Sequence, residues 1–380
     1  MPSKDIYVSQ PSLPDLQDLI PYLEKIWDRK ILTNGGPLHA ELEERLAEHL
    51  GVPHVSLFSN GTLALIVALK VLGLSGEVIT TPYSFVATAN SILWNGLTPV
   101  FVDIEEEGFN LSVEAVEKAV TDRTSAILPV HCYGYPCNND EIIRVSKSHN
   151  LKVVYDAAHS FGVDDDGGSI LRYGDLSILS FHATKVFNTF EGGAIISPDA
   201  ETKKRVDLLK NFGIENETSV PYCGINGKLN EIQAAVGLLQ LDRMDQVFSE
   251  RKEIDEFYRD QFERVIGIDV PPIPNARKRN YSYFPILVNE FSKISRDQLF
   301  YKLREAGIFC RRYFHPLITD LKSFENHPDY RSEKLKNARK VSDRVICLPL
   351  YAGLGLADAR RVVDVTLSCL SGSGMCLRTF

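Results

Sequence analysis

Short apolar runs alternate with helical stretches from about residue 50 to about residue 245. Just before them, the leucines of LHAELEERLAEHL (38–50) recur at helical spacing, which predicts an amphipathic helix ending at Gly51. Strand-like runs such as VSLF, EVIT, KVVYD and LSILS are then separated by helical segments such as FVATANSILW. Apolar strands that alternate with helices predict an α/β domain built around a mostly parallel sheet.

The pattern changes in the last third of the chain. A long helical stretch starts at Leu229, and the proline-rich PPIPNARKRN (271–280) follows it as a boundary. Three further strand-like runs, YSYFPILVN, IFCRRYF and VICLPL, flank helices expected near 295–306, 332–344 and 357–370. We therefore expect an irregular start and a large α/β domain in 1–245. A linking helix and a small α+β domain should occupy 246–380, with GSGMCLRTF as a loose tail.

Composition and charge narrow the class of protein. The 42 lysines and arginines and 50 acidic residues give a net charge of −8 without a basic run, which argues against a nucleic-acid partner. No window approaches the about 18 unbroken apolar residues of a membrane span, and the opening residues do not resemble a signal peptide. Seven cysteines without C-x-x-C or metal-ligand spacing indicate reduced thiols and no metal site. We expect a soluble cytoplasmic protein.

Two polar residues that can carry chemistry follow separate predicted strands. Asp156 closes KVVYD, and Lys185 follows LSILSFHAT. Ligands of open α/β sheets bind at the carboxyl ends of the strands. A partly desolvated lysine there can attack an aldehyde, and an aspartate can keep a heteroaromatic nitrogen protonated. Each residue alone has an ordinary interpretation as a solvated lysine or a turn aspartate, but together they match what pyridoxal 5'-phosphate (PLP) requires.

A third element, Ser59-Asn60-Gly61-Thr62-Leu63, runs from a glycine turn into a predicted helix that opens at Thr62. Its free amides and hydroxyl could bind a phosphate group. Ser180 could donate to the same phosphate or simply face outward from its strand, and Phe85 could stack on a pyridine ring or belong to the core. A nicotinamide-dependent dehydrogenase is disfavoured, because no G-x-G-x-x-G opens a helix after a strand.

Taken together, several segments resemble the DegT/DnrJ/StrS family of fold-type-I, PLP-dependent sugar aminotransferases. They are SNGT, TTPYSFVATAN, YDAAHSFG, SFHATK followed by EGGAI, and GINGKLNEIQAAVGLLQL, and the resemblance spans about residues 25 to 370. It implies that Lys185 forms the Schiff base with PLP and later moves the proton between cofactor and sugar carbons. Asp156 would pair with the pyridine nitrogen. His159 would lie near the phenolic oxygen, where relatives often have glutamine.

The resemblance also implies how the rest of the cofactor is held. Phe85 would stack on the ring, and the phosphate would be bound by Gly61, Thr62, Leu63 and Ser180. An asparagine of the neighbouring subunit reaches this phosphate in the family, and Asn226 in GING matches it. The expected protein is therefore a homodimer with shared active sites, in which an isolated monomer is inactive.

The substrate follows from narrower similarities. The family's dehydratase branch has histidine at the position of Lys185, so the lysine favours transamination. HATKVFNTFEGGAI resembles the members that aminate C4 of dTDP-4-keto-6-deoxyglucose, with L-glutamate as the amino donor. Alternatives are a C3 or UDP-sugar aminotransferase, a transaminase for an amino acid or amino-cyclitol precursor, and a non-catalytic PLP-binding regulator. An amino sugar of this kind serves surface polysaccharides such as O-antigen or glycosylated metabolites.

Two positions depart from the family pattern. Tyr155 stands where the family usually has an acidic residue, and Gly227-Lys228 where it often has Tyr-Arg. A lysine holds a diphosphate as a point charge and an arginine as a planar fork, so this change bears on the substrate. The resemblance assigns nucleotide-sugar contacts to Lys228, Tyr313 and His315, with Arg311 or Arg312 near a phosphate. The alternative for Tyr313, His315, Arg311 and Arg312 is that they form a strand end with ordinary surface cations.

Overall fold

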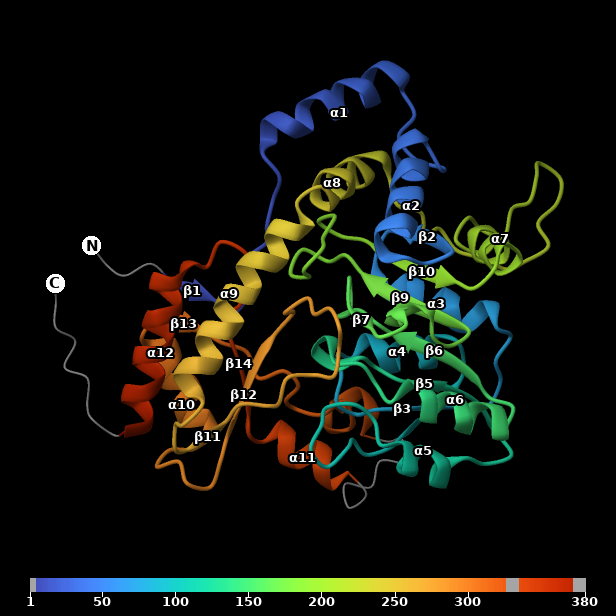
Figure 1. Ribbon diagram of the computed structural model, residues 1–380. Helices are drawn as coiled ribbons and strands as arrows, with labels where there is room; N and C mark the ends of the chain where they lie inside the picture. The colour runs from blue at the N-terminus through green and yellow to red at the C-terminus, as the bar shows by residue number, and fades with distance from the viewer. Residues whose placement is uncertain (1–4, 326–334, 372–380) are drawn as a thin grey trace.

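A central seven-stranded sheet organises the computed structural model, which describes residues 5–325 and 335–371 (Figure 1). Its order is β2-β10-β9-β6-β5-β3-β4, and only β10 runs antiparallel to its neighbours. The prediction of an α/β domain with a mostly parallel sheet is confirmed. The strands are β2 (His54–Phe58), β3 (Glu77–Thr80), β4 (Thr98–Phe101), β5 (Thr124–Leu128), β6 (Lys152–Asp156), β9 (Leu176–Ser180) and β10 (Gly193–Ser197).

Helices cover both faces of this sheet, which is why its strands are apolar throughout. Leu179 packs in a core with α2 and α8, whereas its neighbour Ile178 packs on the opposite face in a core with α3. Beyond β6, α5 and α6 cover the remaining strands with a third core around Ile127. The helices of this part are α2 (Pro37–Leu50), α3 (Gly61–Val71), α4 (Ala87–Trp94), α5 (Val113–Ala119), α6 (Asn139–Ser148), α7 (Ala200–Leu209) and α8 (Glu231–Leu241).

The helix expected over 38–50 is confirmed, and Gly51 ends it in the left-handed conformation with φ 61°. The expectation of an irregular N-terminal segment, in contrast, was wrong. It contains β1 (Ile6–Tyr7) and helix α1 (Leu16–Arg29), which Asp15 caps and which lies across α8. The apolar residues Leu16, Leu19, Leu23 and Ile26 recur at helical spacing, although Pro21 lies inside the helix and only Ile26 of α1 is buried.

A smaller core forms around the C-terminal elements. β12 (Phe284–Val288) lies between β11 (Ile268–Asp269) and β14 (Val345–Leu348) in an antiparallel sheet, covered by α10 (Arg296–Glu305) and α12 (Gly355–Ser371). The expected strand at IFCRRYF is only β13 (Ile308–Phe309), which pairs with β1. The helix expected at 332–344 is α11 (Lys336–Ser342). The tail 372–380 lies outside the described residues.

The long helical stretch from Leu229 is two helices, α8 and α9 (Met244–Phe262), separated by a short break. Val247 of α9 packs in the core of the large sheet, and Tyr258 packs in the C-terminal core. The α9 helix therefore belongs to both hydrophobic cores. A division of the chain at residue 245 remains a prediction.

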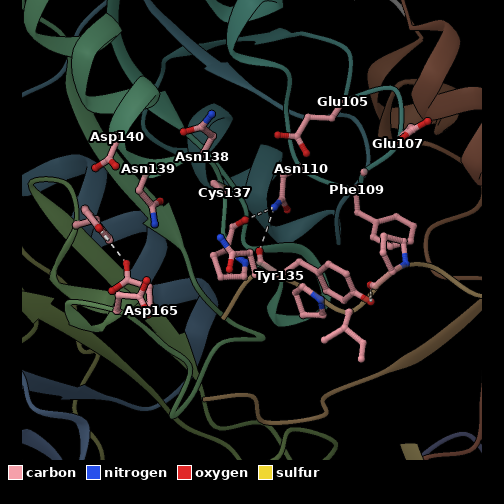
Figure 2. A pocket seen from close by; sticks show the side chains of 18 of the residues that line it. Glu105, Glu107, Phe109, Asn110, Tyr135, Cys137, Asn138, Asn139, Asp140 and Asp165 are labelled. Atoms are coloured by element: carbon pink, nitrogen blue, oxygen red, sulfur yellow. Dashed lines mark hydrogen bonds between the residues drawn. The ribbon is translucent and has the colours of Figure 1, made fainter. Parts of the chain in front are cut away.

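A cavity of about 630 Å³ opens at one side of the large sheet (Figure 2). Glu105 and Asn110 line it from the segment after β4, Asp140 lines it from α6, and Asp165 lines it from β7 (Asp164–Asp165), which forms a hairpin with β8 (Gly168–Ser169). None of the catalytic or binding residues expected from the sequence lines this cavity. The candidate chemistry lies elsewhere, at the strand ends.

Within residues 5–325 and 335–371, no helix is both long and apolar enough to cross a membrane. In the same residues, no group of three or more histidines, cysteines and acidic side chains could hold a metal ion. The cysteines that the structure describes are free thiols.

The Glu231 carboxylate caps α2 from α8, a role with no sequence signal. It accepts hydrogen bonds from the backbone N–H groups of Leu38 (3.1 Å) and His39 (2.8 Å), and it is only 2% exposed. Gly36 leaves room for it, since a Cβ there would lie 2.5 Å from the carboxyl carbon. This contact joins two helices that are far apart in sequence.

Glu231→Ala should lower the free energy of unfolding by about 2 kcal/mol, because two buried N–H groups lose their acceptor. Denaturant unfolding followed by circular dichroism measures this change. Glu44→Ala, on the exposed side of α2, is the matched control and should change stability by less than about 0.5 kcal/mol. Equal losses in the two variants would contradict the capping role.

Candidate active site

Asp156 and Lys185 come from neighbouring parallel strands. Asp156 is the last residue of β6, and Lys185 follows β9 in a turn in which its N–H donates to the carbonyl of His182 (2.8 Å). Burial lowers the pKa of Lys185 to about 8, although the negative charge of Asp156 opposes this shift. A lysine with this pKa is partly unprotonated near neutral pH, so it can act as an amine nucleophile.

The carboxylate of Asp156 is buried, with 5% of the residue exposed. Burial raises its pKa, while hydrogen bonds and the charge of Lys185 oppose the rise. The hydroxyl of Thr88 donates to Oδ2 (2.7 Å), and the N–H of Ala158 donates to Oδ1 (3.2 Å). These donors stabilise the ionised carboxylate, the form that can pair with a protonated ring nitrogen.

His159 lies in an aromatic layer beside this pair. Its ring is 4.9 Å from that of Tyr283, and it stacks on Tyr133 and Phe314 with centroid distances of 6.5 and 6.0 Å. The N–H of Tyr133 donates to Nδ1 (3.1 Å), so the neutral ring carries its proton on Nε2. Burial and the positive charge of Lys185 hold the pKa of His159 well below its usual value. His159 is thus a neutral donor.

The predicted phosphate site lies where α3 begins, next to the end of β9. A Cβ on Gly61 would lie 3.0 Å from the Cβ of Ser180, so these two residues are direct neighbours. The first N–H groups of a helix have no partner within it. The N–H of Leu63 is already capped by the side chain of Asn60 (2.9 Å), which leaves those of Gly61 and Thr62 toward an anion.

Phe85 lies just before α4 and exposes 61% of its surface. Of the two interpretations that the sequence allowed, membership of the core is therefore wrong. An exposed aromatic ring is free to cover a planar ligand, and 61% exposure of a phenylalanine is otherwise unfavourable.

Asn226 and Lys228 lie on a segment that runs beside the end of β2. The N–H of Ser59 donates to the carbonyl of Gly227 (2.8 Å), which places this segment next to the turn before α3. Asn226 is exposed. Lys228 donates from Nζ to Oδ1 of Asn211 (2.9 Å) and lies over the ring of Phe212 at 4.8 Å; burial and Lys210 lower its pKa.

The C-terminal candidates fall into two groups. The ring of Tyr313 is 5.7 Å from that of Tyr283, so this residue reaches the aromatic layer. His315 instead faces α11, where Nδ1 lies 3.3 Å from Oγ of Ser342. Arg312 forms an ion pair with Asp297 at 2.7 Å, and Arg311 is exposed. Of this group, the structure therefore brings Tyr313 into the aromatic layer.

Three residues around the site were not singled out in the sequence analysis as site residues: Thr88, Tyr133 and Tyr283. The ring of Tyr283 lies 6.0 Å from Nζ of Lys185. Tyr133 has a φ of 57°, which is unfavourable for a residue with a large side chain. Each contact joins residues at least 26 positions apart, so no local motif could have revealed it.

The donor set fits PLP. The two N–H groups of α3 and the hydroxyl of Ser180 suit a phosphate, the buried carboxylate of Asp156 suits a protonated pyridine nitrogen, and the amine of Lys185 suits an aldehyde. All of these groups lie at one edge of the sheet. The geometry defines a site for PLP-dependent chemistry.

Comparison with known proteins agrees with this geometry. The model of the DegT/DnrJ/EryC1/StrS aminotransferase family matches residues 15–366, and the chain belongs to this family. It is a PLP-dependent aminotransferase with the corresponding fold.

Particular relatives narrow the comparison. The chain is 53% identical to a dTDP-4-amino-4,6-dideoxy-D-glucose transaminase of Shigella dysenteriae, over 92% of this chain and 95% of the relative. It is 52% identical to the protein of the same name in Escherichia coli, over 93% and 96%. Among solved structures, DesI in the presence of its TDP-sugar product superposes with a TM-score of 0.92 at 35% identity, covering 97% of this chain and 94% of DesI.

Asp156→Asn should lower the pKa of Lys185 below its value of about 8, because the negative charge that opposes the effect of burial is removed. The measurement is the extent of Lys185 acetylation against pH in cofactor-free protein, read by peptide mass spectrometry. Asp166→Asn, which changes an exposed carboxylate on the hairpin, should leave the midpoint in place. An unchanged midpoint in Asp156→Asn would refute the charge coupling.

Proposed function

We propose that this chain transfers the amino group of L-glutamate to C4 of dTDP-4-keto-6-deoxyglucose, giving dTDP-4-amino-4,6-dideoxyglucose. The main support for this proposal is Lys185, whose pKa is about 8 and which is electrostatically coupled to the buried Asp156 on the neighbouring strand. The relatives at 52–53% identity support the choice of sugar and ring position.

The phosphate and one ring face of the cofactor are proposed to contact different parts of the site. The amides of Gly61 and Thr62 and the hydroxyl of Ser180 bind the phosphate. Phe85 covers one face of the ring. Leu63 contributes through its position in the same helical turn, since its own N–H is bonded to Asn60.

Lys185 is the proposed catalytic residue. When bound, PLP supplies an aldehyde that accepts amino groups and a protonated ring that withdraws electrons from the bonds to the substrate carbon. Lys185 would move the proton between the substrate carbon and the cofactor carbon on the other side of the nitrogen, first as general base and then as general acid. Asp156 would keep the ring nitrogen protonated, and His159, whose Nδ1 accepts from the N–H of Tyr133, would have its Nε2–H available for the phenolic oxygen.

The nucleotide sugar is proposed to lie over the aromatic layer, with Tyr313 and Lys228 in contact with it. Tyr313 supports this role through its position beside Tyr283. His315 remains part of the proposal at longer range, because its ring is turned toward α11. The lysine at 228 would hold a phosphate as a point charge.

A homodimer with shared sites is part of the proposal. Large apolar side chains are exposed on the segment before Asn226, where Phe212 is 48% and Val220 60% exposed, and on α1, where Trp27 is 65% exposed. Exposed apolar groups of this extent favour a protein interface. Asn226 is exposed and pairs with Asn211, the residue before Phe212. Its amide is therefore available to a partner's phosphate site.

We place the enzyme in the cytoplasm, where thiols stay reduced, in agreement with the free cysteines of the described ranges. Its product is proposed to feed a surface polysaccharide such as O-antigen. An amino sugar linked to a nucleotide is chemically the donor that a glycosyltransferase consumes.

L-Glutamate should bleach the visible absorption of the PLP-loaded enzyme, and after removal of glutamate dTDP-4-keto-6-deoxyglucose should restore it. Lys185→Ala should show no measurable turnover, since the group proposed to move the proton is removed. Recovery with the 3-keto isomer or a UDP sugar alone would reassign the substrate within the family. A band that responds to neither glutamate nor sugar would instead indicate a PLP-binding regulator.

Subunit exchange tests the shared site. Asn226→Ala should weaken PLP binding by about tenfold, the value of one hydrogen bond to a charged group. Mixed with Lys185→Ala at limiting PLP, it should regain activity, because one site of each mixed dimer combines an intact Lys185 with an intact Asn226 of the partner chain. Each variant alone is the control. No regain would show that Asn226 acts within its own chain.

A further inference from the structure

A chain of two hydroxyl groups leads to the carboxylate of Asp156. Oγ of Ser84 lies 2.8 Å from Oγ1 of Thr88, which in turn donates to Oδ2 of Asp156 at 2.7 Å. Ser84 is 5% exposed and Thr88 is fully buried. Thr88 is in the first turn of α4, whereas Asp156 ends β6. The two hydroxyl groups therefore join two elements on the same edge of the sheet.

The direction of these hydrogen bonds is set by the ionised carboxylate, which can only accept. Thr88 must therefore use its single proton toward Asp156, and the proton between the two hydroxyls must come from Ser84. A protonated Asp156 would instead be able to donate, and the order of the chain could reverse. Ser84 and Thr88 together thus favour the charged form over the neutral form.

Few other groups face this carboxylate. The N–H of Ala158 donates to Oδ1, Lys185 is the positively charged group coupled to Asp156, and the thiol of Cys132 is a nearby titratable group. Burial opposes ionisation more strongly than any one of these groups favours it. The loss of a single hydroxyl donor should therefore raise the pKa of Asp156 further.

We propose that Thr88 is a positioning residue for the reaction: its hydroxyl, oriented by Ser84, fixes the carboxylate of Asp156 in the orientation and charge state that the ring nitrogen of PLP requires. This inference rests on PLP as the cofactor and is independent of which sugar is the substrate. Thr88 acts only through Asp156 and is not itself a catalytic residue.

Two variants of Thr88 form a matched pair for the test. Thr88→Val keeps the shape of the side chain and removes the hydroxyl, and Thr88→Ser keeps the hydroxyl. PLP affinity of the cofactor-free protein is measured against pH by fluorescence quenching. Affinity should fall at low pH as Asp156 becomes protonated, because the neutral carboxyl no longer pairs with the charged ring nitrogen.

In Thr88→Val this fall should begin at higher pH, with a midpoint raised by about one unit, since the ionised carboxylate has lost a hydrogen bond. Thr88→Ser should keep the wild-type midpoint. Ser84→Ala should shift it in the same direction by less, because Thr88 can still donate. A general structural defect would weaken binding at every pH without moving the midpoint.

An unchanged midpoint in Thr88→Val would overturn the inference while leaving PLP-dependent transamination intact. If Thr88→Val does not fold, as judged by circular dichroism, a wild-type midpoint in Ser84→Ala overturns the proposal in its place. Failure of the wild-type protein to bind PLP would contradict the cofactor assignment itself. The three outcomes are distinguishable.

Discussion

The site depends on the desolvation of two opposite charges at adjacent strand ends. Burial favours the neutral forms of both Asp156 and Lys185, and the charge of each group partly opposes the effect of burial on the other. The balance leaves a lysine that can react and a carboxylate that needs further donors. Thr88 and the N–H of Ala158 provide them. The parallel sheet makes this possible, because β6 and β9 deliver both residues to the same edge.

The C-terminal part of the chain completes the surroundings of this pair. The hydroxyls of Tyr83 and Tyr133 lie 2.6 Å apart, and both contact the carbonyl oxygen of Tyr313. The backbone N–H of Tyr133 also fixes the tautomer of His159 that has its proton on Nε2. A contact between the large-sheet part and the segment after β13 therefore also orients a group of the site, and α9 packs both in a core of the large sheet and in the C-terminal core.

Much of the site was predictable because its strongest signals are local. Lys185, Asp156 and the turn before α3 each lie at a strand end or helix start that periodicity reveals. The exposure and hydrogen-bond partners of individual site residues were not predictable. The capping of the Leu63 amide by Asn60, the exposure of Phe85 and the turning of His315 toward α11 depend on packing around each residue.

The sequence by itself determined the strands of the large sheet, most helices and the family to which the chain belongs, and it predicts Lys185 as the reactive lysine. Tertiary structure alone decided the pKa of Lys185, the tautomer of His159, the hydroxyl chain to Asp156 and the cap that Glu231 gives to α2. The physical reason is distance along the chain. Periodicity records which residues are buried in one element, whereas desolvation and hydrogen bonding arise between elements that only folding brings together.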